Sequence, residues 1–152
     1  MTQAPTQVRT LLDLIAREAR QSGVFGEVTI APTRVECAAK DAAEPAFYRV
    51  DIEGNDALVS LVTANRWLSE SIESDLLHTG DSMEELVEEE LVELGVSGVT
   101  PTIRHYRSDD KHFTFKSGVP GGLNAGAKTI ATWLLAYEAA FRNLGDMAGA
   151  EE

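Results

Sequence analysis

The chain has 152 residues, of which 43% are hydrophobic and 25% are charged, and it carries a formal net charge of −12. These values predict a folded domain with a packed core and exclude wholesale disorder. The negative charge repels phosphate backbones and anionic lipid, so we expect neither direct nucleic-acid binding nor membrane binding. A single cysteine, no signal-peptide pattern and no bilayer-length apolar run predict a cytoplasmic protein without an intrachain disulfide.

The first half of the chain predicts one helix followed by strands. Apolar residues recur at three- and four-residue steps over 6–22, and Gly23 is placed to end this amphipathic helix. The β-branched runs EVTIA and TRVECA follow, and AFYRVDIEGNDALVSLV contains a tight-turn signal at Gly54 and Asn55. We interpret this region as a three-strand meander.

The second half predicts a helical pair, a hairpin and a final helix. The pair covers NRWLSESIESDLLH and DSMEELVEEELVELG, with Asp81 and Glu84 as a capping box and Gly95 as the terminator. TIRHYRS and KHFTFKS read as a β-hairpin. After a mobile connector, SGVPGGLNAG, the last helix runs from about Asn124, its cap, to Leu144, with one narrow apolar face.

This order of elements predicts an α+β fold: helix, three-strand meander, helical pair, β-hairpin, helix. We expect a single domain over residues 1–152, with a frayed tail from about 146. Helices normally cover one face of an antiparallel sheet, so aromatic residues of the opposite alternation are candidates for its uncovered side. Phe47, or Phe113 and Phe115, fit this position, and Trp67 lies off the apolar stripe of its helix.

The segment from Asp81 to Gly95 carries seven carboxylates and no basic residue. On a helical wheel its apolar arc is formed by Met83, Leu86, Val87, Leu91 and Leu94. Most of its glutamates therefore face solvent. Two residues depart from this pattern, because Glu90 falls within the apolar arc and Val92 lies among the carboxylates. A sharper hypothesis is that these two residues, with Glu85, Glu88 and Glu89, contact another polypeptide.

Patterns typical of metal or nucleotide sites are incomplete in this sequence. The pairs Asp75 with His78, and Glu85 with Glu88, each share a helical face but lack further convergent ligands. GGLNAGAKT lacks the Gly-Lys-Ser/Thr of a phosphate-binding loop. His105 and His112 are expected cross-strand neighbours without a third ligand.

Cys37 alternates with Val35 on a short strand and is interpreted as a small buried hydrophobe rather than a nucleophile. We find no catalytic constellation, so we predict a noncatalytic protein with no catalytic, metal-binding or cofactor-binding residues and no cofactor. The alternative function is a magnesium-dependent nucleotide hydrolase that uses the Glu-rich helix.

The element order, together with LVSLVTANRWLSESIESDLLHTGDSMEELVEEELVELG and HYRSDDKHFTFKS, resembles the YbjN-like family of bacterial proteins. The fold of that family is similar to that of class I type III secretion chaperones. The resemblance covers residues 6–144 and rests on element order and general texture rather than on a sharp motif. It implies helices packed on one face of a twisted antiparallel sheet, in a homodimer.

The resemblance also implies a noncatalytic role. Secretion chaperones of this shape bind extended segments of partner proteins, and YbjN-like proteins are associated with stress and sensory regulation. Because the sequence shows no secretion context, we expect a cytoplasmic adaptor or chaperone-like regulator in the bacterial stress response. Its expected partner is a protein, with a basic nucleic-acid-binding protein as the specific hypothesis. The candidate contact residues are Glu85, Glu88, Glu89, Glu90, Val92, Phe47 and Trp67.

Overall fold

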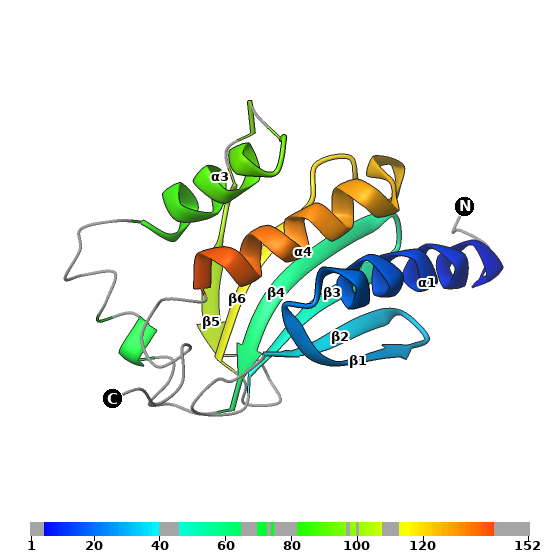
Figure 1. Ribbon diagram of the computed structural model, residues 1–152, viewed down its shortest axis with the longest axis horizontal. Helices are drawn as coiled ribbons and strands as arrows, with labels where there is room; N and C mark the ends of the chain where they lie inside the picture. The colour runs from blue at the N-terminus through cyan, green and yellow to red at the C-terminus, as the bar shows by residue number, and fades with distance from the viewer. Residues whose placement is uncertain are drawn as a thin grey trace.

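The computed structural model describes residues 5–39, 46–64, 70–72, 74, 82–96, 98–99, 101–107 and 113–141. It confirms the α+β class, with helices against one face of a six-stranded antiparallel sheet (Figure 1). In chain order the elements are α1 (Pro5–Ser22), β1 (Phe25–Ala31), β2 (Arg34–Ala39), β3 (Phe47–Glu53), β4 (Asp56–Thr63), α3 (Met83–Glu93), β5 (Arg104–Arg107), β6 (Phe113–Gly118), a 3-10 turn η1 (Gly122–Ala125) and α4 (Ala127–Phe141). No described helix is long and apolar enough to cross a membrane.

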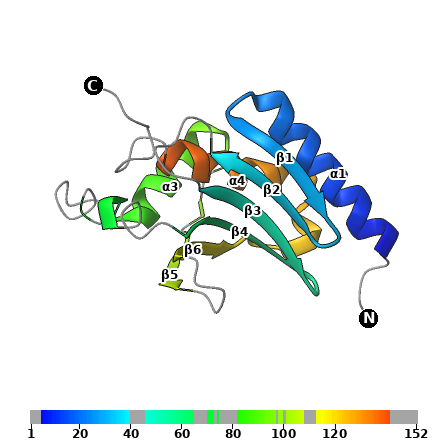
Figure 2. The ribbon, with the colours of Figure 1, turned by 90° about the horizontal axis from the view of Figure 1, so that it is seen from below.

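The sheet has the strand order β1-β2-β3-β4-β6-β5. Its first part is a meander of four strands rather than the expected three. The extra strand arises because Gly54, with a φ of 64°, turns the chain between β3 and β4, as its sequence signal indicated. The predicted hairpin of β5 and β6 is confirmed, and because β6 pairs with β4, β5 becomes an edge strand. Figure 2 shows the sheet from the side opposite the described helices, which we call its uncovered face.

Helix α1 has the amphipathic stripe that its sequence predicts. Leu12, Ile15 and Ala19 are buried, and α1 packs along β1 and β2. The helix ends at Ser22, and Gly23 follows it with a φ of 73°, a left-handed conformation that favours glycine. Of the helix predicted just before the acidic helix, only residues 70–72 and 74 are described, and they are helical.

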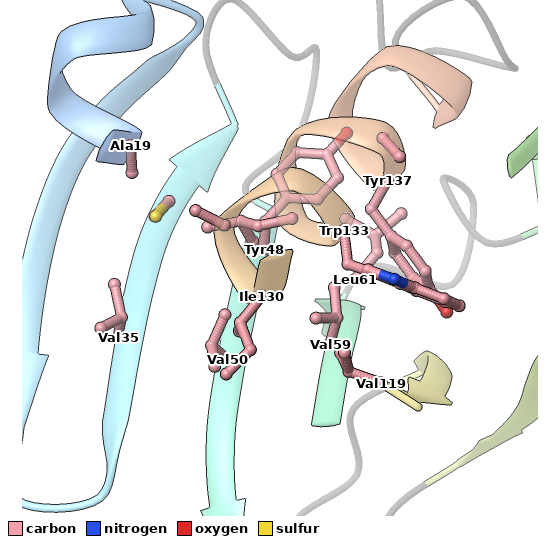
Figure 3. Close-up of a cluster of buried hydrophobic side chains, with 14 of the residues drawn as sticks. Ala19, Val35, Tyr48, Val50, Val59, Leu61, Val119, Ile130, Trp133 and Tyr137 are labelled. Atoms are coloured by element: carbon pink, nitrogen blue, oxygen red, sulfur yellow. The ribbon is translucent and has the colours of Figure 1, made fainter. Parts of the chain in front are cut away.

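Helix α4 is the centre of the core. It packs on β3 and β4 and is flanked by α1 and α3. Figure 3 shows Ile130, Trp133 and Tyr137 of this helix in one cluster with side chains from the strands. The prediction of one narrow apolar face was wrong, because nine residues of α4 are buried, namely Ile130, Ala131, Trp133, Leu134, Ala136, Tyr137, Glu138, Ala140 and Phe141. Because α4 contacts the sheet, α1 and α3, it needs apolar residues on several sides.

The connector before α4 is a defined turn rather than a mobile segment. Gly122 begins η1, and the N–H of Leu123 donates to the carbonyl of Asn55 at 2.9 Å, which ties the connector to the turn between β3 and β4. Asn124 lies within η1 and is not the cap of α4, which begins at Ala127. Residues 142–144, also predicted to be helical, lie outside the described residues.

This turn predicts a large effect of Gly122→Ala. A Cβ at Gly122 would lie 2.2 Å from the carbonyl oxygen of Asn55, whereas at Gly121 the nearest atom would be 3.5 Å away. Both glycines have positive φ, so an alanine at either position strains the backbone. Only Gly122→Ala also adds a clash with another backbone atom. We expect Gly122→Ala to lower the free energy of unfolding by more than about 2 kcal/mol and Gly121→Ala by about 1 kcal/mol. Equal losses in urea denaturation would contradict this.

Candidate functional site

Helix α3 lies beside α4 (Figure 1), with one side buried in the core and the other side exposed. Met83, Val87 and Leu91 are buried, and Leu86 is half-buried. The prediction that Leu94 belongs to the apolar arc was wrong, because its side chain is 45% exposed. The helix ends at Glu93, with Leu94 as its C-cap, and Gly95 follows with a φ of 97°. The chain therefore leaves the helical path at Leu94, and the side chain of Leu94 does not reach the core.

The N-terminus of α3 carries a capping box, but not at the predicted residues. Ser82 is the N-cap: its hydroxyl accepts from the N–H of Glu85 at 3.1 Å, and the Glu85 carboxylate accepts from the N–H of Ser82 at 3.2 Å. The sequence spacing from Asp81 to Glu84 is equally compatible with a box, so local pattern alone did not fix the register. Glu84 instead accepts a hydrogen bond from the N–H of Ile103 at 3.3 Å.

The remaining acids of α3 surround an open hollow of about 730 Å³. It is lined by Glu88, Glu89, Glu90, Val92 and Glu93. Val92 is 52% exposed, as the helical wheel predicts, and Glu90 is half-buried at the edge of the packed face. The hollow thus combines an exposed apolar side chain with four carboxylates, and none of these four forms an ion pair within the part of the chain that the structure describes.

The predicted contact residues do not form one site. Glu88, Glu89, Glu90 and Val92 meet at the hollow, whereas Glu85 is used in the capping box. Phe47 is half-buried on the uncovered face of the sheet, on the far side from the helices. Trp67 lies outside the described residues. A surface that includes both Phe47 and α3 therefore requires two separate contacts.

Of the two alternatives for the uncovered face, the structure supports Phe47 and contradicts Phe113 and Phe115. Phe115 is 3% exposed and makes an edge contact with Phe141 of α4, at 5.1 Å between ring centroids. Its partner in the strand register is Leu61, which belongs to the core, and Phe113 shares its alternation. The sequence could not assign the face of Phe115. In FTFKS one alternation begins with Phe113 and the other with Thr114, and both residue types fit a half-buried strand.

His105 is not part of a metal site within the described residues. Its ring stacks on Phe115 with centroids 3.9 Å apart, which accounts for its position on β5. His78, His112 and Asp75 lie outside the described residues. In the described ranges, no group of three or more His, Cys, Asp and Glu side chains is arranged to hold a metal ion.

The uncovered face of the sheet carries cross-strand ion pairs that no sequence motif indicates. The Arg34 guanidinium contacts the Asp51 carboxylate, and the Nε of Arg49 lies 2.7 Å from the Oε2 of Glu36. In the sequence, the feature that indicates these ion pairs is the alternation of charged and apolar residues in RVECAA and FYRVDIE. It places these four charges on the face opposite the core.

Cys37 is fully buried on β2, as predicted. Burial raises the pKa of its thiol to about 12; the positive charge of Arg20 opposes this rise and the negative charge of Glu36 adds to it. Tyr137, hydrogen-bonded to Ser117 in the core, also has a raised pKa because of burial. Both groups favour their neutral forms.

The raised pKa of Cys37 predicts a loss of stability at alkaline pH. The thiol ionises near pH 9.0 when solvated but keeps its proton to about pH 12 when folded, so the free energy of unfolding should fall as pH rises through this window. We expect urea denaturation to show a loss between about pH 8 and about pH 10 that is larger in the native chain than in Cys37→Ala, by about 1 kcal/mol. Identical losses would show that Cys37 does not contribute.

Comparison of the chain with protein-family models, with curated proteins and with solved structures finds no match.

Proposed function

We propose that this protein is a noncatalytic adaptor or chaperone-like regulator that binds a basic segment of a partner protein at α3. The observation that carries the proposal is the hollow on α3, which is lined by four glutamates and by the exposed apolar side chain of Val92. A lysine- or arginine-containing segment matches both features, because its charged groups pair with the carboxylates while its aliphatic stems cover the valine.

Electrostatics supports this choice of partner. Glu89 and Glu93 are four residues apart on one helix, and like charges at this spacing destabilise a helix. A basic partner relieves this repulsion and is also attracted over distance by the excess negative charge of the chain. The capping box and the buried Met83, Val87 and Leu91 hold α3 in place, so the acidic surface is formed before a partner arrives.

The biological setting belongs to the same proposal. The YbjN-like resemblance implies a cytoplasmic regulator in the bacterial stress response. The described elements share its order of a helix, a strand meander, an acidic helix, a β-hairpin and a final helix, but the meander has four strands in place of three. A chaperone-like role is supported by an apolar side chain left exposed within a charged surface. The resemblance also implies a homodimer.

Charge neutralisation at the hollow tests the proposal. We expect the triple variant Glu88→Gln, Glu89→Gln, Glu93→Gln to bind a lysine-rich peptide of about 20 residues roughly tenfold more weakly and with less dependence on salt. Isothermal titration calorimetry at two salt concentrations measures both effects.

A control variant separates local contact from net charge. Glu18→Gln, Glu27→Gln, Glu53→Gln changes the net charge equally, at positions on α1, β1 and β3. We expect this variant to keep nearly all of the affinity. Equal weakening in both variants would show that only the overall field attracts the peptide and would remove the proposed site.

The homodimer is a separate prediction. Sedimentation velocity at several protein concentrations should show a species of twice the monomer mass of 16.5 kDa. A single monomeric species across the whole concentration range would contradict the dimer without affecting the binding proposal.

A further inference from the structure

A row of polar residues crosses the uncovered face of the sheet. The strand register pairs Arg104 with Lys116, Lys116 with Ser60, and Ser60 with Arg49. Directly paired residues of antiparallel strands project on the same side, and Arg49 pairs onward with Glu36. The four adjacent strands β5, β6, β4 and β3 (Figure 2) thus bring three cationic side chains and one hydroxyl into a line on the face opposite α4.

Ser60 at the centre of this row is an exception among buried polar groups. Its residue is 1% exposed, and its Oγ has no hydrogen-bond partner. Buried hydroxyl groups almost always find a partner, and each exception calls for an explanation, such as a water or ion that satisfies it. The two neighbours of Ser60 in the row are Lys116 on one side and Arg49 on the other, and both have long cationic side chains.

The positive charges of the row exceed the negative ones. Arg49 forms an ion pair with Glu36, but Arg104 and Lys116 form no ion pair within the described ranges. Instead, both lie near the ring of Tyr106, with the Arg104 Cζ 5.6 Å and the Lys116 Nζ 6.0 Å from its centroid. The Tyr106 ring carries no net charge, and no acid within the described ranges compensates these two positive charges, although the net charge of the chain is −12.

We propose that this row, Arg104, Lys116, Ser60 and Arg49, is a binding site for a phosphate group. The two uncompensated charges match a phosphate dianion, and the hydroxyl of Ser60 supplies a donor that has no other use. A tetrahedral phosphate accepts hydrogen bonds from several directions, which suits donors on separate strands better than a planar carboxylate does. The long side chain of Lys116 allows its ammonium group to turn from Tyr106 toward the ligand.

This site is independent of the proposed partner surface, because it lies on the uncovered face of the sheet whereas α3 packs beside α4 on the other side. The ligand is inorganic phosphate or a small phosphate monoester. Of the acids on this face, Glu36 and Asp51 are each held by an arginine, which limits their repulsion of an anion, and Glu53 and Asp56 lie at the β3–β4 turn, four residues along the chain from Arg49 and Ser60.

Calorimetric titration of the full chain with inorganic phosphate and, separately, with glycerol 3-phosphate tests the site and distinguishes the two sources. We expect saturable binding of at least one probe. Lys116→Gln should weaken it about tenfold or more, because a charged donor is lost, and Ser60→Ala about fivefold. Lys128→Gln, an exposed cation on α4, should leave the affinity unchanged.

Thermal unfolding without ligand separates binding from folding. Because the Ser60 hydroxyl is unsatisfied, Ser60→Ala should keep or raise the unfolding temperature of the free protein while reducing its stabilisation by phosphate. The proposal is overturned if the native chain shows no saturable binding of either probe, or if Lys116→Gln or Ser60→Ala binds as tightly as Lys128→Gln.

Discussion

The burial of α4 between the sheet and its two neighbouring helices is the constraint on which the rest of the structure depends. Trp133, Tyr137 and Phe141 are among its largest fully buried side chains, and removing each from water contributes roughly 3 kcal/mol. Because α4 covers β3 and β4 on one side only, the same strands must place their other alternation on the opposite face. The position of α3, which packs on α4 rather than on the sheet, follows from the same contact.

This arrangement divides the charged residues of the chain between two surfaces. The side of α3 that does not face α4 collects glutamates, whereas the uncovered face of the sheet brings Arg34, Arg49, Arg104 and Lys116 together with the acids Glu36, Asp51, Glu53 and Asp56. Each surface also has an unusual uncharged member, exposed Val92 on the first and unsatisfied Ser60 on the second. The row of Arg49, Ser60, Lys116 and Arg104 is therefore a locally positive strip on a chain whose net charge is −12.

Local patterns predicted the existence of elements better than their details. The helical stripe of α1 and the turn at Gly54 were recognised because each depends on neighbouring residues. The cap of α3 was misplaced by one residue, since Asp81 and Ser82 both fit the role and the choice depends on where the helix meets α4. The cap assigned to Asn124 was wrong for a similar reason: the contact of Leu123 with Asn55 holds that segment in a 3-10 turn.

The sequence by itself determined the α+β class, most of the strands and the outward orientation of most α3 glutamates, because periodicity and net charge are properties of neighbouring residues. Only the tertiary structure decided that Phe115 faces the core, that Phe47 and α3 lie on different sides, and that Ser60 lies between Lys116 and Arg49. These facts depend on the pairing of β4 with β6, which are 49 residues apart from the end of one to the start of the other. Such long-range register is fixed by which side chains α4 buries, and no local pattern contains it.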